Sequence, residues 1–254
     1  MLSSEILRFD SLPSTNLEVA KLAVEGAPEG LCVVASEQTA GRGRMDRQWI
    51  SPKGAGIYFS ILLRPRLPQT QWPLITLMAS LAVHEALLKA CSLQTDIKWP
   101  NDIISNERKL CGILAETVDT PSGRAVVVGI GINLTNAAFP RELDEIATSV
   151  ESATGNAPAL ELILQMLITA LEVRYEKLHA ARGPVEVVEE WGRRSSYARG
   201  KRIRITNGND ILAGTTRGLV SDGALRIETD EGEIRVVRAG DVSLRAVKDN
   251  SGEL

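Results

Sequence analysis

The chain is poor in the residues that most often act as nucleophiles and metal ligands. It has three cysteines, Cys32, Cys91 and Cys111, and two histidines, His84 and His179, among 254 residues. The cysteines are odd in number and widely spaced, which fits neither a disulfide framework nor a CxxC metal site. The histidines fall in or beside segments of helical periodicity, without a serine or cysteine motif nearby. These patterns argue against covalent catalysis and against a zinc site.

Long apolar runs and a strong charge of one sign are also missing. The longest apolar run, residues 74–83, ends at His84 and has about half the length needed to cross a bilayer. Glu5, Arg8 and Asp10 interrupt the first ten residues, unlike the apolar region of a signal peptide. The net charge of −3 gives no overall attraction to a polyanion. We therefore expect a cytoplasmic protein that binds neither membranes nor DNA.

The patterns that are present indicate a globular chain of mixed α and β structure. Apolar residues at helical spacing predict helices over 14–26, 72–90 and 160–178. Short runs rich in β-branched residues predict strands over 31–35, 57–63, 109–118 and 125–134. The first helix is expected to bury Leu17, Ala20 and Val24, and Thr15 with Glu18 fits a capping box. Because strands and helices do not alternate strictly, an α+β fold with a mixed sheet is favoured over a doubly wound one.

The C-terminal fifth of the chain has a different pattern. Short segments of alternating apolar and polar residues lie at 203–206, 211–216, 224–229, 233–238 and 242–245. Turn signals such as Asn207-Gly208 separate them. This pattern predicts a small SH3-like β-barrel. We expect two domains, at residues 1–195 and 196–254.

A segment dense in glycine and arginine, residues 38–49, lies between two predicted strands. Gly41 and Gly43 allow backbone N–H groups to approach a ligand, and the arginines offer forked donors to carboxylate or phosphate. The spacing matches neither the P-loop GxxxxGK[ST] nor the dinucleotide fingerprint GxGxxG. An anion-binding loop is the functional interpretation, and an exposed turn with solvated charges is the alternative.

Two further segments carry groups that suit an anion. Residues 98–102, KWPND, predict a turn at a strand end that presents Asn101 and Asp102, although a simple capped turn explains them too. Lys109 opens a strand in which Gly112 indicates a bulge or the close approach of a ligand, and a solvated lysine is the alternative. Three such elements in one domain predict a ligand that carries both carboxylate and phosphate.

Together these segments resemble biotin protein ligases. Five elements occur in the family's order: Ser14-Thr15-Asn16, Glu37 to Arg47, Lys98 to Asp102, Lys109 to Glu116, and Gly129 to Leu134. With the C-terminal barrel, the resemblance covers nearly the whole chain. It implies an α+β, mixed-sheet catalytic domain of the class II synthetase and biotin ligase type, followed by an SH3-like β-barrel that helps ATP binding or carrier docking.

The resemblance implies a two-step reaction with ATP and Mg²⁺. The carboxylate of biotin attacks the α-phosphate of ATP, giving biotinyl-5′-AMP and pyrophosphate, and a lysine of a biotin carboxyl carrier protein then attacks the mixed anhydride. Such chemistry needs positioning and fixed positive charge more than covalent help. Lys109 and Arg44 are the expected catalytic residues, and Asp102 is the expected metal ligand.

The resemblance also assigns the binding residues. The expected biotin-binding residues are Ser14, Thr15, Asn16, Gln38, Gly41, Arg42, Gly43, Arg44 and Lys109. The expected residues for ATP and the adenylate are Arg42, Arg44, Arg47, Trp49, Asn101, Asp102, Lys109, Ile132 and Asn133. Helix capping is the alternative role for Ser14 and Thr15, and a place in the core is the alternative for Trp49.

Some features separate this chain from parts of the family. Asp46 stands where glycine is frequent, and we still expect the loop to close over ligand because its arginines are kept. The first family motif begins at Ser14, so we expect a ligase without the N-terminal DNA-binding domain of some members. A homodimer is compatible with the resemblance. A lipoate or octanoate ligase and a non-catalytic small-molecule-binding module remain the alternative functions.

Overall fold

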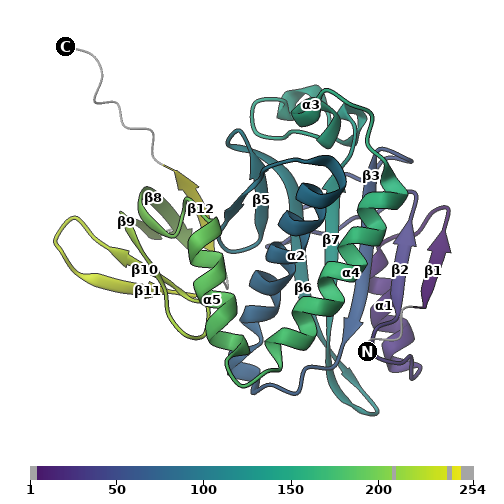
Figure 1. Ribbon diagram of the computed structural model, residues 1–254, viewed down its shortest axis with the longest axis horizontal. Helices are drawn as coiled ribbons and strands as arrows, with labels where there is room; N and C mark the ends of the chain where they lie inside the picture. The colour runs from purple at the N-terminus through teal and green to yellow at the C-terminus, as the bar shows by residue number, and fades with distance from the viewer. Residues whose placement is uncertain (1–4, 208–209, 239–241, 247–254) are drawn as a thin grey trace.

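The computed structural model describes residues 5–207, 210–238 and 242–246 (Figure 1). Gly208 of the predicted turn and the outermost residues of the two predicted domains, 1–4 and 247–254, lie outside these ranges. The larger part is a mixed sheet in which seven strands are described, in the order β1-β2-β3-β7-β6-β5-β4. The β1 and β2 strands pair in parallel, and the other neighbours pair antiparallel. The strands are β1 (Ile6–Phe9), β2 (Cys32–Ala35), β3 (Gly56–Leu63), β4 (Asp96–Lys98), β5 (Asp102–Ser105), β6 (Arg108–Thr120) and β7 (Gly123–Asn133).

Helices cover both faces of this sheet (Figure 1). The helices α2 (Pro73–Cys91), α4 (Leu160–Leu178) and α5 (Gly183–Arg194) pack on one face and contribute to the main core. The helix α1 (Thr15–Val24) packs on the other face over a smaller apolar cluster. The short helix α3 (Val150–Thr154) and the 3-10 turns η1 (Gln69–Gln71), η2 (Asn136–Ala138) and η3 (Arg141–Leu143) lie in the connections. The α+β prediction is confirmed.

The helix α2 is a core helix, although residues 69–91 are long and apolar enough to cross a membrane by length and composition. In its most apolar stretch, 67% of the residues are buried inside the protein. Leu74, Met78 and Leu81 are fully buried, and α4, α5 and β6 pack around the helix. Because this apolar surface is already covered by other elements, its composition reflects burial in the protein core.

The helix α1 forms where the sequence predicts it, and Ala20 packs on the smaller apolar cluster, but the prediction of a buried face is wrong for Leu17 and Val24. Leu17 and Val24 are 47% and 50% exposed, whereas Thr15 and Asn16 are buried. The backbone of Ser14 has extended N-cap geometry, but its side chain makes no capping hydrogen bond. The helix therefore turns its polar first residues inward, toward groups on the sheet, because those groups satisfy their hydrogen bonds.

The C-terminal unit is a small antiparallel sheet, as the alternating pattern predicts. Its strands, in the order β11-β10-β9-β8-β12, are β8 (Arg199–Asn207), β9 (Asp210–Leu219), β10 (Leu225–Glu228), β11 (Ile234–Val237) and β12 (Val242–Ala246). The hydrogen-bonded order of the described strands ends at β11 and β12, so they form an open sheet rather than a closed barrel. The indole of Trp99 donates to the carbonyl of Gly223 at 3.0 Å, and Ile203 and Leu225 extend the main core into this unit.

Candidate active site

A pocket of about 1210 Å³ lies where the 38–50 loop meets strands β5, β6 and β7, the segment 138–147 and the start of β8. All but two of the residues expected in the site line this pocket. They are Ser14, Thr15, Asn16, Gln38, Arg42, Gly43, Arg44, Arg47, Trp49, Asn101, Asp102, Lys109 and Asn133. The fold thus brings together segments that are far apart in the sequence.

Glycines on β6 and β7 form the floor of the pocket beneath Trp49. Gly112 and Gly131 are paired across the two strands. A Cβ on Gly131 would lie 2.4 Å from the indole nitrogen of Trp49, and a Cβ on Gly112 would lie 3.1 Å from its six-membered ring. The indole therefore rests directly on the backbone at Gly131, where a side chain has no room, and lies close to the backbone at Gly112. Trp49 belongs to the pocket wall, as one of the two alternatives predicts.

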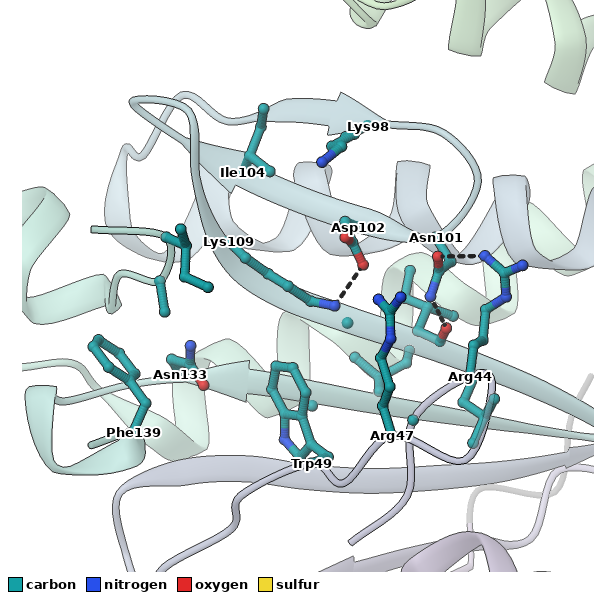
Figure 2. Close-up of a pocket in the computed structure, with 18 of the residues that line it drawn as sticks. Arg44, Arg47, Trp49, Lys98, Asn101, Asp102, Ile104, Lys109, Asn133 and Phe139 are labelled. Carbon is teal, nitrogen blue, oxygen red and sulfur yellow. Dashed lines mark hydrogen bonds and ion pairs between the residues drawn. The ribbon is translucent and has the colours of Figure 1, made fainter. Parts of the chain in front are cut away.

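Lys109 extends across the pocket from the start of β6 (Figure 2). Its Nζ is 2.7 Å from Oδ1 of Asp102 and 5.3 Å from the centre of the Trp49 ring. Its backbone N–H donates to the carbonyl of Ile146 at 2.8 Å, which fixes the base of the side chain. The lysine is thus held by a carboxylate and an aromatic face, both favourable for a cation.

The loop arginines approach the strands from the opposite side (Figure 2). Nη1 of Arg44 donates to Oδ1 of Asn101 at 3.1 Å, and Nδ2 of Asn101 donates to the carbonyl of Ile113 at 2.8 Å. In Figure 2, Arg47 rises from the same loop beside Arg44 and points toward Lys109. Three cationic side chains therefore line one part of the pocket, which suits a polyanionic ligand.

Neutral polar groups line the part of the pocket formed by α1 and the start of the loop. Oε1 of Gln38 accepts from the backbone N–H of Thr15 at 2.8 Å and from its hydroxyl at 3.1 Å. Nε2 of Gln38 donates to the hydroxyl of Ser51 at 2.9 Å. The capping interpretation of Ser14 and Thr15 is therefore wrong for their side chains, since Thr15 bonds across to the loop.

Two of the expected site residues, Gly41 and Ile132, do not line the pocket. Ile132 is fully buried in the main core, because strand alternation directs its side chain away from that of its pocket-lining neighbour Asn133. Gly41 lies behind the pocket lining, where a Cβ would come within 2.2 Å of the carbonyl oxygen of Trp49. Its role is to let the two arms of the loop approach each other, as the hydrogen bond from the N–H of Trp49 to the carbonyl of Gly41 shows.

The C-terminal unit contributes residues that the sequence analysis missed. Tyr197, Lys201 and Arg202 line the pocket, and the ring of Tyr197 has Nζ of Lys98 and of Lys201 at 5.9 Å and 5.2 Å from its centre. Burial, followed by the nearby charge of Glu107, raises the pKa of Tyr197 to about 12, so its phenol stays neutral. The basic stretch at 201–204 was the available signal, but a solvated linker explains such a stretch equally well.

The pocket provides no reactive thiol among its described residues. Burial raises the pKa of Cys32 to about 12 and raises that of Cys111 as well, so both are neutral thiols at physiological pH.

No group of three His, Cys, Asp or Glu side chains in the described ranges is arranged to hold a metal ion. Asp102 offers one carboxylate to the pocket, with its Oδ1 paired with Lys109 at 2.7 Å, and Mg²⁺ needs only one or two protein carboxylates because it keeps water ligands.

Comparison with known proteins identifies the family to which this architecture belongs. A model of the biotin/lipoate A/B protein ligase family matches residues 7–133, and a model of the biotin protein ligase C-terminal domain matches residues 199–245. The chain belongs to the biotin/lipoate A/B protein ligase family. Every expected site residue, from Ser14 to Asn133, lies within the matched region of this ligase.

Relatives of this ligase are similar over most of their length. It is 38% identical to the bifunctional ligase/repressor BirA of Bacillus subtilis over 249 residues, which cover 96% of this chain and 75% of that protein. It is 34% identical to the biotin–[acetyl-CoA-carboxylase] ligase of Mycobacterium tuberculosis, with 90% and 85% covered. The structure of the biotin protein ligase from Aquifex aeolicus in complex with biotin and ATP matches with a TM-score of 0.84 at 28% identity, covering 96% and 99% of the two chains.

Proposed function

We propose that this ligase activates biotin with ATP and transfers it to a lysine of a biotin carboxyl carrier protein. The observation that carries the proposal is the convergence of Lys109, Arg44 and Arg47 with the neutral polar groups around Thr15 and Gln38 in one pocket. Its volume of about 1210 Å³ exceeds the roughly 300–1,000 Å³ typical of a single-ligand site, which suits two substrates held side by side. The activities named for the relatives agree with this chemistry.

In the first step, a carboxylate oxygen of biotin forms a bond to the α-phosphorus of ATP. The bond from that phosphorus to the bridging oxygen breaks, and pyrophosphate leaves with the electron pair. We assign Lys109 and Arg44 to hold the carboxylate and the α-phosphate together, because both side chains are cationic and fixed from opposite walls. The ion pair of Lys109 with Asp102 keeps the lysine aimed into the pocket before ligand arrives.

In the second step, the ε-amine of the carrier lysine attacks the carbonyl carbon of the mixed anhydride. The bond from that carbon to the phosphate oxygen breaks, AMP leaves with the electron pair, and the nitrogen loses a proton. Transfer of this kind is accelerated by orientation and by stabilisation of the departing phosphate charge. The loop arginines supply that charge in the absence of a covalent enzyme intermediate.

We divide the pocket between the two substrates by the chemistry of its walls. Hydroxyl and amide groups of Ser14, Thr15 and Gln38, with backbone groups near Gly43, suit the ureido ring of biotin, which has one acceptor and two donors. Trp49, Asn101 and Asn133 are assigned to the nucleotide. Mg²⁺, when bound, would neutralise the phosphates, with Asp102 as the assigned protein ligand.

The remaining assignments concern the domain boundary, the role of the C-terminal domain, location, oligomeric state and DNA binding. We place the domain boundary between residues 195 and 196, since α5 ends at Arg194 and β8 begins at Arg199. We assign the C-terminal domain, through Tyr197 and Lys201, to the nucleotide end of the pocket. A cytoplasmic location agrees with the three free cysteines. A homodimer and the lack of operator binding are proposed from the family resemblance and the net charge of −3.

Pyrophosphate release tests the proposal. The protein is incubated with ATP and Mg²⁺ and with biotin, lipoate or octanoate in parallel, and the adenylate is identified by mass. Release with biotin alone, lost in Lys109→Ala, is expected. Release only with lipoate or octanoate would show the same reaction with a different acid as substrate. Binding of any of these acids without pyrophosphate release would identify a non-catalytic module.

A further inference from the structure

An ion pair between Arg42 and Glu116 connects the 38–50 loop to strand β6. Oε1 of Glu116, which lies in β6, is 2.8 Å from Nη2 of Arg42, and its Oε2 is 3.3 Å from Nη1. Two carboxylate oxygens thus meet two guanidinium nitrogens, the forked arrangement that gives such pairs geometric specificity. Glu116 does not line the pocket. Arg42 itself lines the pocket, but its guanidinium is paired with a carboxylate that lies outside the pocket lining.

The same carboxylate also holds the start of α1. Nδ2 of Asn16 donates to Oε2 of Glu116 at 2.8 Å, and Oδ1 of Asn16 accepts from the hydroxyl of Ser60 at 2.7 Å. The hydroxyls of Ser60 and Thr15 are 2.7 Å apart, and the backbone N–H of Thr15 donates to Gln38 at 2.8 Å. Ser60 is fully buried and Asn16 is 5% exposed. One continuous network of satisfied polar groups therefore connects the Arg42 loop with the neutral polar end of the pocket.

We propose that Glu116 is a positioning residue that clamps Arg42, and that Arg42 anchors the 41–47 loop rather than contacting the phosphates. This inference rests on the proposed ligase function. With the clamp in place, the backbone around Gly43 is held beside Gln38, where the ring of biotin is assigned. Biotin binding depends on this clamp, whereas adenylyl transfer depends on Lys109 and Arg44 and is left largely intact without it.

Substitution of either partner tests the clamp. Glu116→Gln keeps a side-chain oxygen that can accept from Asn16 but removes the charge that pairs with Arg42. It therefore removes the ion pair and leaves the hydrogen bonds of Asn16 in place. Arg42→Ala removes the other partner. Glu161→Gln is the matched control, because Glu161 makes a similar two-point contact with Arg8 at 2.9 Å and 2.8 Å, outside the pocket.

The clamp predicts a specific pattern of kinetics. Glu116→Gln and Arg42→Ala each raise the KM for biotin about threefold to tenfold, while kcat and the KM for ATP stay within about twofold. The double variant is no worse than either single variant, because both remove the same interaction. In the protein without ligand, amide hydrogen exchange over residues 38–50 becomes faster in both single variants and is unchanged in Glu161→Gln.

Two results would overturn the inference. If Arg42→Ala raises the KM for ATP or lowers kcat while Glu116→Gln has no effect, Arg42 contacts the phosphates. Unchanged hydrogen exchange over the loop in Glu116→Gln would show that no clamp exists, even if the protein proves inactive on biotin. Failure of the wild-type protein to release pyrophosphate refutes the proposed function instead, and the exchange measurement then decides the clamp independently.

Discussion

Replacing Gly129 by alanine should destabilise the protein through a clash with Asn16. Gly129 lies in β7, and an added Cβ would sit 2.1 Å from Oδ1 of Asn16, against at least 3.4 Å for an ordinary contact. Asn16 is nearly fully buried and is held by Ser60 and Glu116 at 2.7 Å and 2.8 Å. The side chain has no free space to enter, so it must leave its partners or force the strand and helix apart.

The expected cost follows from these contacts. Two lost hydrogen bonds cost about 1 kcal/mol each, and overpacking adds about 1–3 kcal/mol. The smaller entropy of alanine in the unfolded chain offsets about 0.4–1 kcal/mol. The net loss is about 2–5 kcal/mol, or about 4–18 °C in Tm for a chain of this size. The KM for biotin should rise as well, because Asn16 belongs to the pocket wall.

Thermal unfolding followed by circular dichroism measures this loss, with two comparison variants. Gly192→Ala in α5 is the matched control, since a Cβ there meets nothing within 4 Å; it should raise stability by up to about 1 kcal/mol. Asn16→Ala removes the clashing oxygen, so adding Gly129→Ala to it should cost little more. A Tm equal to that of the wild type in Gly129→Ala, or the same further loss in the Asn16→Ala background, would refute the steric reasoning.

Three further predictions concern pH and the loop. Burial, followed by the charges of Arg194 and Arg174, lowers the pKa of His84 below its ordinary 6.5. As the pH falls, the unfolded chain therefore takes up a proton at this histidine before the folded protein does. Tm should fall between about pH 7 and about pH 5, and it should fall less steeply in His84→Gln. Equal slopes would contradict this. The hydrogen bonds from Arg174 lower the pKa of Glu190 to about 2. Glu190→Gln should therefore lower the free energy of unfolding by about 1–3 kcal/mol at neutral pH. This difference from the wild type should shrink as acid protonates the wild-type carboxyl, and a difference independent of pH would contradict the prediction. Asp46 has φ of 55°, in the left-handed region that favours glycine, so calorimetry should show Asp46→Gly binding biotin within about twofold of the wild type. A larger loss would mean that its carboxylate supports the loop.

The sequence by itself determined the local elements and the chemistry of most pocket residues. The 160–178 helix and the strands around 57–63 and 125–134 follow from apolar periodicity, which depends only on neighbouring residues. The glycine and arginine density of residues 38–49 likewise indicates an anion-binding loop before any fold is known. The short strands β1, β4 and β5 and the helix α5 were missed. Three or four residues carry too little periodicity for these strands, and α5 begins and nearly ends with glycine, which weakens a helix pattern.

Only the tertiary structure decided which side chains meet across long distances in the chain. Asn16 and Glu116 are 100 residues apart, and nothing local indicates that the first needs the second or that Gly129 must leave room for it. The same holds for Tyr197, which joins the pocket from the C-terminal unit. Local periodicity predicts whether a residue faces inward, but a buried polar side chain is satisfied only by specific partners, and the packing of whole elements determines which partners those are.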